Sequence, residues 1–398
     1  MRVAFNARLL RDPNLRGFNR YTVNLLAELS KLGLELMLYS DRPIHQSHLE
    51  RLQAGTFQTV VSPPMRYVVW EQRWLPRQLA LDGADLLHTP FNFGIPWFCP
   101  CPCVLTLHDA IDQVYYAPRT TGREKYSRGA IVSRLHQWAA RERADFIITV
   151  SEHAKSDLVS FFGLPAERVK AIHEAADAHF GAPVSQETRS KIRNRWELSR
   201  PYAFYVGGWE GRKNLPFLLR GFAAANLKDV DLVLAGGRDD QRADLTQLAH
   251  SLGIDDQLKL LAWIDEDDLP GLYAETMCFI YPSEYEGFGL QLCEAMAAGC
   301  PVIAAAATSL PEVLGRGGET FDPHDADALA ALIRRIAEDR EYRDSMAARA
   351  IARSRDFSWE GAARKTIDVY ESALASSSRA LSRSASVDEP RLVEPTKQ

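Results

Sequence analysis

The sequence predicts an α/β protein with two Rossmann-like domains, each built on a parallel sheet, that face each other across a cleft. Three observations support this class. The chain has 398 residues, which favours two domains at about 100–200 residues each. Short apolar runs alternate with amphipathic stretches, and these runs are continuous, as is typical of parallel strands covered on both faces. The alternation breaks once, at the polar stretch 178–200, and then resumes.

In the first half, apolar runs predict buried strands, and the amphipathic stretches between them predict helices. The expected strands are 2–6, 34–39, 57–61, 85–89, 104–107, 146–150 and 169–172, and the expected helices are 21–32, 66–81, 122–143 and 152–162. The stretch 178–200 is expected to be irregular because it is polar. We therefore expect a first Rossmann-like domain over 1–178.

A second series of strands and helices follows. The expected strands are 203–206, 232–235, 258–261, 278–281 and 302–305, and the expected helices are 215–225, 242–252, 268–274, 290–298, 328–337 and 347–355. This series predicts a second Rossmann-like domain over 179–357. A last helix over 358–375 is expected to cross back to the first domain. Residues 376–398 are rich in Ser and charge and are expected to form a disordered tail.

Composition excludes several classes of protein. The net charge of −5 argues against a general nucleic-acid binder. No run approaches the ~20 apolar residues of a membrane span, and the first residues lack the pattern of a cleaved signal, so a cytoplasmic location is expected. Cys99, Cys101 and Cys103 alternate with prolines and make a poor zinc site, whereas the other three cysteines are expected to be buried.

The most specific pattern lies near the end of the second domain. An expected strand is followed by Glu286, by Gly287, Phe288 and Gly289, by a helix, and by Glu294 eight positions after the first glutamate. The glycines allow the backbone to approach a ligand, and the N-terminus of the following helix attracts phosphate. Glu294 can accept two hydrogen bonds from a ribose diol. The plainer interpretation is a glycine turn with a solvated and a capping glutamate.

This segment, with Gly-Cys-Pro at 299–301 after its helix, resembles the two-glutamate motif of glycosyltransferase family 4, retaining enzymes of the GT-B fold. By order of elements the resemblance covers about residues 1–373. It implies that the domain over 1–178 binds the acceptor and that the domain over 179–357 binds the nucleotide sugar. It implies that Glu286 holds hydroxyls of the transferred sugar and that Glu294 holds the ribose. The turn residues between them, together with Leu290, are implied to bind the donor.

A second motif follows the first strand of the second domain. That strand ends at Gly207 and Gly208, and the basic pair Arg212 and Lys213 stands just before a helix. Helix N-termini favour acidic residues, so a basic pair there needs another role, such as neutralising a pyrophosphate. Relatives often carry a basic residue where this chain has Gly208, so the basic pair is expected to carry more of the phosphate clamp. The alternative is a solvated basic turn.

Two further candidates lie in the first domain. The expected strand 104–107 runs into His108, and in the family a histidine at such a place faces the reacting sugar carbon; the alternative is a core histidine. Where relatives usually show Gly-Ile-Gly-Arg-Tyr after the first strand, this chain keeps Gly17 and Arg20 in a turn with fewer glycines. Gly17 is expected beside the donor. Glu312, at a helix start near the cleft, is a weaker candidate.

The resemblance implies a retaining hexosyltransferase that moves a mannosyl or glucosyl group from a GDP- or UDP-linked sugar to a sugar or lipid-linked acceptor, in polysaccharide or glycolipid biosynthesis. Charge on the leaving diphosphate needs electrostatic stabilisation. The expected catalytic residues are Glu286, His108 and Lys213. No cofactor and no metal are expected, because the Asp-x-Asp pairs begin a strand at Asp229 and a helix at Asp325 rather than following a strand.

The acceptor side carries a local excess of basic residues. The segment 119–143 holds seven lysines and arginines against two glutamates, and Trp70, Trp74 and Trp138 lie in the same domain. The default interpretation is a solvated helix face. The sharper one is weak peripheral association with an anionic inner membrane face or a phospholipid acceptor.

Two alternatives stay open at this point. A sugar-nucleotide epimerase of the GT-B fold would need no acceptor, so an assay with the nucleotide sugar alone separates the two activities. A degenerate transferase that serves as a scaffold would bind no nucleotide.

Overall fold

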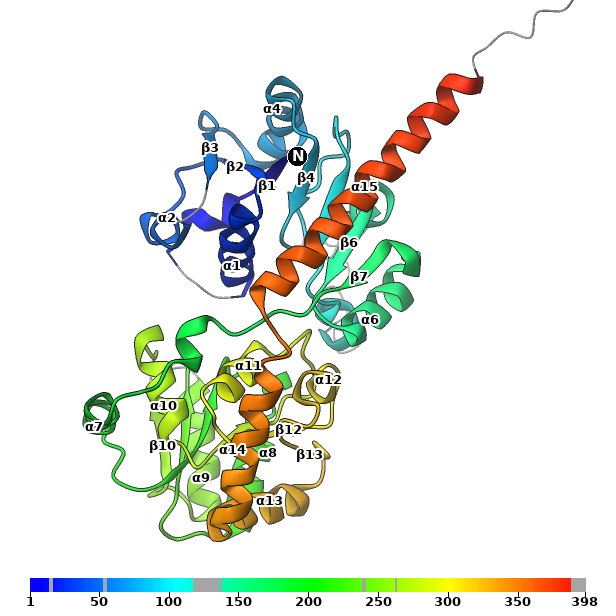
Figure 1. Ribbon diagram of the computed structural model, residues 1–398. Coiled ribbons are helices and arrows are strands. Elements are labelled where there is room, and N and C mark those ends of the chain that lie inside the picture. The colour runs from blue at the N-terminus through cyan, green and yellow to red at the C-terminus, as the bar shows by residue number, and fades with distance from the viewer. Residues whose placement is uncertain are drawn as a thin grey trace, which may run out of the picture.

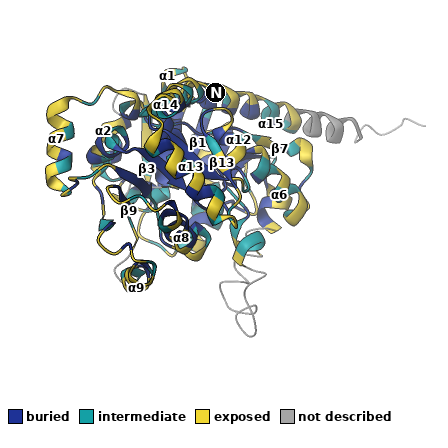
Figure 2. Ribbon diagram, turned by 90° about the horizontal axis from the view of Figure 1, so that it is seen from below, coloured by how far each residue is buried: buried dark blue, intermediate teal, exposed yellow. Residues whose placement is uncertain are grey.

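The computed structural model describes residues 1–13, 17–52, 56–116, 135, 138–237, 241–261 and 263–387. Two α/β domains lie one above the other, and the last helix, α15, runs from the lower domain along the upper one (Figure 1). Buried residues fill the interior of both domains, while α7 and α9 expose much of their surface (Figure 2). The predicted two-domain architecture is confirmed.

In the described part of the chain, the first domain holds a seven-stranded parallel sheet in the order β3-β2-β1-β4-β5-β6-β7. All seven strands lie within one residue of the predicted bounds. They are β1 (Arg2–Asn6), β2 (Glu35–Ser40), β3 (Phe57–Val61), β4 (Leu86–Thr89), β5 (Cys103–Thr106), β6 (Phe146–Thr149) and β7 (Val169–Ala171). The order reverses between β1 and β4, and ligands of such sheets bind beyond the carboxyl ends of strands at this point.

The second domain holds a six-stranded parallel sheet in the order β10-β9-β8-β11-β12-β13, counted over the same described residues. Its strands are β8 (Tyr202–Val206), β9 (Asp231–Ala235), β10 (Leu258–Leu261), β11 (Cys278–Tyr281), β12 (Val302–Ala305) and β13 (Glu319–Phe321). The sequence did not predict β13, because Phe321 is its only apolar residue and so it shows no apolar run. Cys278, Cys293 and Cys300 are buried, as predicted.

Most predicted helices are present, but α14 begins seven residues before the expected start at 347, and α2 was not predicted. The helices are α1 (Phe18–Lys31), α2 (Gln46–Leu52), α3 (Tyr67–Val69), η2 (Trp70–Trp74), α4 (Leu75–Asp82), α6 (Glu152–Phe162), α7 (Gln186–Arg195), α8 (Leu215–Ala225), α9 (Arg242–Leu252), α10 (Leu269–Glu275), α11 (Leu290–Ala297), α12 (Leu310–Leu314), α13 (Ala326–Glu338), α14 (Arg340–Ser354) and α15 (Trp359–Val387). Most of the expected helix 122–143 lies outside the described residues.

The stretch 178–200 is not irregular throughout, as was expected. It contains α7, whose N-cap Ser185 accepts a hydrogen bond from the Thr188 amide at 3.1 Å. Ile192 is the only residue of α7 that is buried. A helix that buries so little shows no apolar stripe, which explains why the sequence pattern did not reveal it.

Helix α15 packs on α1, β5 and β6 of the first domain, with Ala363, Thr366, Tyr370 and Ala373 fully buried. It continues to Val387, so the part of the expected disordered tail up to that residue is helical. The chain has no glycine or proline between Ala362 and Pro390, so nothing in the sequence stops the helix earlier. The rest of the tail lies outside the described residues. No helix in the described chain combines the length and the apolar character of a membrane span.

Candidate functional site

Three predicted site residues form one buried charged cluster at the carboxyl ends of β8 and β11. The ammonium of Lys213 lies 2.5 Å from Oε1 of Glu286, and a guanidinium nitrogen of Arg212 lies 2.9 Å from Oε2. Lys213 and Glu286 are 5% and 8% exposed. Both cations therefore hold the same carboxylate, and the cluster carries one net positive charge.

The local backbone positions this cluster. Arg212 and Lys213 end a short 3-10 turn, η8 (Gly211–Lys213), and Asn214 then adopts a left-handed conformation before α8 begins. On the other side, the Glu286 amide donates to Oγ1 of Thr308 at 3.0 Å, and Ser309 donates to the Glu286 carbonyl at 3.0 Å. The carboxylate and the cations are thus fixed by two separate loops of the same domain.

Electrostatics keeps the cluster charged. Burial lowers the pKa of Lys213, while the Glu286 carboxylate opposes that shift. Burial would raise the pKa of Glu286, but the charges of Lys213 and Arg212 outweigh it and lower this pKa. Each partner is therefore ionised because the other is present.

Two polar neighbours that sequence reasoning missed complete the cluster. Lys213 also donates to the Tyr281 hydroxyl at 3.2 Å, and that hydroxyl donates to Gln291 Oε1 at 3.0 Å. Tyr281 ends β11, and Gln291 lies in the first turn of α11. The sequence gives little sign of this role for Tyr281, because a tyrosine at the end of a buried strand is usually a core residue.

Gly287 lies where the second domain meets the first. A methyl group at this position would come within 2.8 Å of the His108 carbonyl oxygen and 2.9 Å of the Asp109 Cβ. The hydroxyl of Ser151 donates to the Gly287 carbonyl at 2.6 Å. Glycine is required here because two segments of the chain approach closely, not because the backbone adopts a conformation that only glycine favours.

His108 follows β5 and is held on all sides. Its Nε2 lies 3.1 Å from the Pro90 carbonyl, which fixes the proton on that nitrogen, and its Nδ1 lies 3.3 Å from Glu174. Its ring packs against Phe18 and Tyr21, with ring centroids 4.7 Å apart in both pairs. The histidine thus borders the cleft but has partners on both ring nitrogens.

A cavity of 230 Å³ adjoins the cleft, and glycines line much of it. Four predicted donor-binding residues face it: Gly17, Gly207, Leu290 and Glu294. Gly208, Gly236 and Gly237 add further side-chain-free wall, and Ile264 and Leu269 add apolar wall. Backbone amides and an apolar wall beside a carboxylate are what a nucleotide requires.

Glu294 is 3% exposed and has partners on both oxygens. Arg20, from α1 of the first domain, donates to Oε1, and the Tyr273 hydroxyl donates to Oε2 at 3.1 Å. Arg20 also donates to Glu266 at 2.6 Å. Arg20 was noted in the glycine-poor turn, but its partnership with Glu294 was not foreseen.

This pairing joins the two domains. Arg51 of α2 reaches Glu266 at 3.2 Å and Asp177 of the linker at 3.6 Å. Burial raises the pKa of Glu294 to about 7, the charge of Arg20 opposes this rise, and the carboxylates of Asp177 and Glu266 add to it. Glu294, the residue expected to bind the ribose, is therefore also part of an ionic contact between the two domains.

Other predicted residues have different places. Phe288 is buried, with its ring 5.8 Å from that of His173 and 6.0 Å from that of Phe357. Gly289 is the N-cap of α11 at a φ of 96°, a backbone region that favours glycine. Glu312 accepts from the Glu152 amide at 2.9 Å and so caps α6 of the first domain, rather than facing the donor cavity.

No cluster of three or more histidine, cysteine, aspartate or glutamate side chains that could hold a metal ion occurs among the described residues. Asp231 begins β9, and Asp325 caps α13 by accepting from the Ala328 amide at 2.9 Å. Asp231 therefore belongs to a strand start and Asp325 to a helix cap.

Two family models match the chain and together cover most of it. Residues 15–180 match the model described as Glycosyltransferase Family 4, and residues 186–353 match the model described as Glycosyl transferases group 1. The gap between the two matches lies in the linker between the domains.

Two curated relatives match over most of their own length, whereas the WbdA mannosyltransferases of Escherichia coli match over about a third of theirs. The O-antigen chain mannosyltransferase B of Escherichia coli is 32% identical over 304 residues, which is 75% of this chain and 77% of that protein. The D-inositol 3-phosphate glycosyltransferase of Salinispora tropica is 30% identical, over 90% of this chain and 81% of the relative.

Solved structures share the fold. Anabaena HepE in complex with UDP and glucose superposes with a TM-score of 0.73 at 18% identity, over 94% of this chain and all of that one. The sucrose-phosphate synthase of Thermosynechococcus elongatus gives 0.72 at 23% identity. These likenesses confirm the GT-B fold.

Proposed function

Because the chain belongs to glycosyltransferase family 4 and is a glycosyltransferase, we propose that it transfers a mannosyl or glucosyl group from a nucleotide diphosphate sugar to a sugar or lipid-linked acceptor. We further propose that the transfer retains the anomeric configuration and needs no cofactor or metal. The observation that carries the proposal is the buried pair Arg212 and Lys213 on Glu286, next to a glycine-lined cavity that contains Glu294.

The cluster suggests how the charges are used. Two cations share one carboxylate, so a donor diphosphate brings the negative charge that the cluster lacks. As negative charge grows on the β-phosphate during departure of the sugar, Lys213 and Arg212 stabilise it. The Glu286 carboxylate then accepts hydrogen bonds from hydroxyls of the transferred sugar.

Retention is proposed to occur by attack on the face from which the diphosphate departs. The acceptor hydroxyl attacks the anomeric carbon, the bond from that carbon to the β-phosphate oxygen breaks, and the departing phosphate takes the acceptor proton. His108 would border the transferred sugar, and Glu174 and Pro90 hold its ring in one orientation. Glu294 would accept the two ribose hydroxyls.

The donor is proposed from the relatives. The Escherichia coli relative is named a mannosyltransferase, which favours a mannosyl donor such as GDP-mannose, whereas the Anabaena structure contains UDP and glucose. A thermal-shift panel of GDP-, UDP- and ADP-linked sugars tests this choice. A ligand at about 100 times its dissociation constant adds ~2.7 kcal/mol to the free energy of unfolding, so the true donor should stand out.

The acceptor and location are proposed on similar grounds. The name of the Escherichia coli relative points to growth of an O-antigen chain, which suggests a carbohydrate acceptor and polysaccharide biosynthesis. We place the enzyme in the cytoplasm, with weak peripheral association at the inner membrane face. The described basic residues Arg141 and Arg143 are exposed and suit such a surface; the other basic residues of the segment lie outside the described chain.

One assay separates the alternatives. Incubation of the protein with the preferred nucleotide sugar, with and without an acceptor glycan, should release the nucleotide diphosphate mainly when the acceptor is present. If the nucleotide sugar is converted to an epimer in the absence of acceptor, the protein is an epimerase rather than a transferase. If no nucleotide sugar shifts the melting temperature, the chain is a scaffold.

A further inference from the structure

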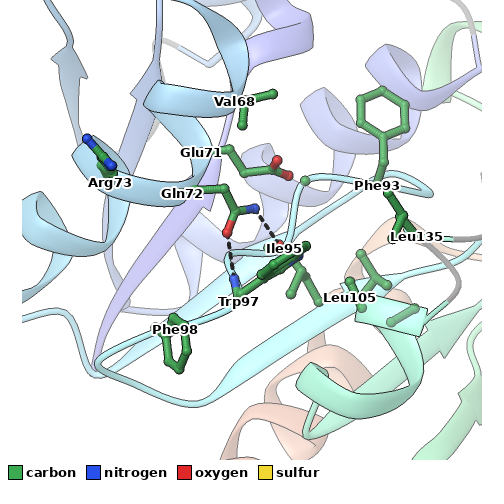
Figure 3. A pocket seen from close by; sticks show the side chains of 13 residues that line it. Val68, Glu71, Gln72, Arg73, Phe93, Ile95, Trp97, Phe98, Leu105 and Leu135 are labelled. Atoms are coloured by element: carbon green, nitrogen blue, oxygen red, sulfur yellow. Dashed lines mark hydrogen bonds between the residues drawn. The ribbon is translucent and has the colours of Figure 1, made fainter. Parts of the chain in front are cut away.

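The first domain contains a second cavity, of 420 Å³, that the proposed donor chemistry does not use. It lies between the η2 turn and the loop that follows β4, with Val68, Phe93, Ile95, Leu105, Ala139 and Ala140 among its lining residues. Its volume lies within the range of small-molecule sites. Figure 3 shows apolar side chains around most of this space.

Two of the polar side chains that line the cavity, Glu71 and Gln72, already have hydrogen-bond partners within the protein. The Gln72 side chain accepts from the Trp97 amide at 2.9 Å and donates to the Ile95 carbonyl at 3.4 Å, the two dashed lines in Figure 3. Glu71 accepts from the Tyr67 hydroxyl at 3.0 Å. A ligand therefore finds mainly carbon surface, and a polar ligand would lose its hydration without replacement.

The mouth of the cavity exposes large apolar side chains to an unusual degree. Phe98 is 78% exposed, Val68 66%, Leu135 46% and Trp97 44%. Exposed apolar surface that surrounds a cavity marks a binding site more often than scattered apolar residues do. Arg143 lies over this rim, with its guanidinium carbon 5.5 Å from the Phe98 ring centroid, and the exposed Arg73 also lines the cavity. Positive charge beside exposed aromatic rings suits an amphiphile with an anionic head.

The loop that follows β4 lines the cavity and also contacts His108. The loop after β4 contains Pro90, whose carbonyl contacts the His108 ring, and Asn92, whose side chain accepts from the His108 amide at 2.8 Å. Phe93 and Ile95, which follow Asn92 in the same loop, line the cavity. One short segment therefore connects the expected sugar position to the apolar space.

We propose that this cavity binds the hydrocarbon chain of a lipid-linked acceptor, with the phosphate of that lipid beside Arg73 and Arg143. The inference rests on the proposed transfer function and specifies its acceptor class. The lipid would place the acceptor sugar near His108, while its chain anchors it in the first domain. The relevant partner is a single-chain isoprenoid or alkyl phosphate rather than a free oligosaccharide.

The test uses the full chain and n-alkyl phosphates of six to twelve carbons, each below its micelle concentration, in isothermal titration calorimetry. Affinity should rise about fourfold for each added methylene until the cavity is filled, which corresponds to ~0.8 kcal/mol per methylene, and should then level off. The heat capacity change of binding should be negative, as apolar burial requires.

Matched variants locate the site. Phe98→Asp and Val68→Asp place a charge at the mouth and should weaken decyl phosphate binding at least tenfold. Phe161→Asp and Leu81→Asp change side chains that are 56% and 69% exposed in the same domain but do not line the cavity, and should leave binding unchanged. Because all four side chains are exposed, the fold should survive, which far-UV circular dichroism can confirm.

Several outcomes would overturn the inference. Affinity that does not depend on chain length, or equal binding by the mouth and control variants, would remove the cavity from lipid binding. Sedimentation that shows a dimer, converted to a monomer by Phe98→Asp, would assign the rim to a second copy of the chain instead. Nucleotide-sugar binding is measured in the same variants: if it is absent throughout while alkyl phosphates bind, the transfer function fails and the cavity assignment stands.

Discussion

Donor affinity should depend on pH through Glu294, which is the sharpest consequence of the site's electrostatics. This carboxyl is buried, its pKa is raised to about 7 mainly by burial, and Arg20 and Tyr273 occupy its oxygens. The ionised form can accept both ribose hydroxyls, whereas the protonated form loses part of its acceptor capacity. Lowering the pH through 7 should therefore weaken donor binding.

The magnitude follows from the titration of a single group. With a pKa of about 7, the carboxyl is about nine-tenths ionised at pH 8 and about one-tenth ionised at pH 6. If only the ionised form binds the ribose, the dissociation constant rises about tenfold over this interval, and most of the change falls between pH 7.5 and 6. This window lies well above the usual range of a glutamate.

The assay is isothermal titration calorimetry with GDP-mannose and UDP-glucose at pH 8, 7 and 6. A nucleotide sugar is preferred to the free diphosphate, because a terminal phosphate takes up a proton near pH 6 and would confuse the result. Glu294→Gln should bind more weakly at pH 8 and show no dependence on pH. Glu338→Gln, an exposed glutamate in the same domain, is the control and should behave like the parent.

The same group links pH to stability. Its pKa is raised from 4.5, so the protonated form contributes stability that is present below pH 4.5 and is lost as the pH rises through 7. The free energy of unfolding of the parent should fall relative to Glu294→Gln by up to about 3 kcal/mol over that interval.

Donor affinity that is equal at pH 8 and 6, or a pH dependence that persists in Glu294→Gln, would refute the assignment of Glu294 to the ribose.

The remaining predictions concern the charged cluster, metal and the last helix. Lys213→Ala should lower turnover by about 10²–10³ with a small change in donor Michaelis constant, because its charge acts on the departing diphosphate; a variant within a few-fold of the parent would remove Lys213 from the chemistry. Glu286→Gln should also lower turnover more than donor affinity, and the reverse split in steady-state kinetics would exchange its role with that of Glu294. Turnover should survive EDTA, and loss with recovery by magnesium or manganese would show that a metal is needed. Cutting the chain after Ala375 should leave the melting temperature nearly unchanged, because Ala373 is the last residue of α15 that is buried among those whose side chains are described; a fall of several degrees would show that the end of the helix packs on the body.

The sequence predicted the sheets well because each strand is a separate local signal. A continuous apolar run such as 278–281 is recognised without knowledge of its neighbours, and it matches β11. Elements without such a signal were missed. The polar helix α7 buries only Ile192, and β13 has Phe321 as its only apolar residue, so neither shows an apolar run or a hydrophobic period. The local hydrophobic pattern therefore predicts elements that are largely buried and misses elements that bury few residues.

The sequence also revealed only part of the candidate site. Glycine turns and the two glutamates could be found because their chemistry is concentrated in short motifs such as 286–294. The partners of these residues could not be found, because they depend on how distant segments meet: Arg20 and Glu294 are 274 positions apart, and Lys213 and Glu286 are 73 apart. Spacing in the sequence carries no information about such pairs without a known fold.

The pairing of Arg20 with Glu294 gives the site a property that neither motif has alone. Arg20 belongs to the first domain and Glu294 to the second, so a carboxylate assigned to the donor is also a contact that holds the domains together. A ribose that binds Glu294 must share its oxygens with Arg20 and Tyr273, or displace one of them. Since Arg20 also pairs with Glu266, a displaced Arg20 still has a partner in the second domain. If Glu294 holds the ribose as proposed, donor binding would weaken one ionic contact between the domains while the contact between Arg20 and Glu266 remains.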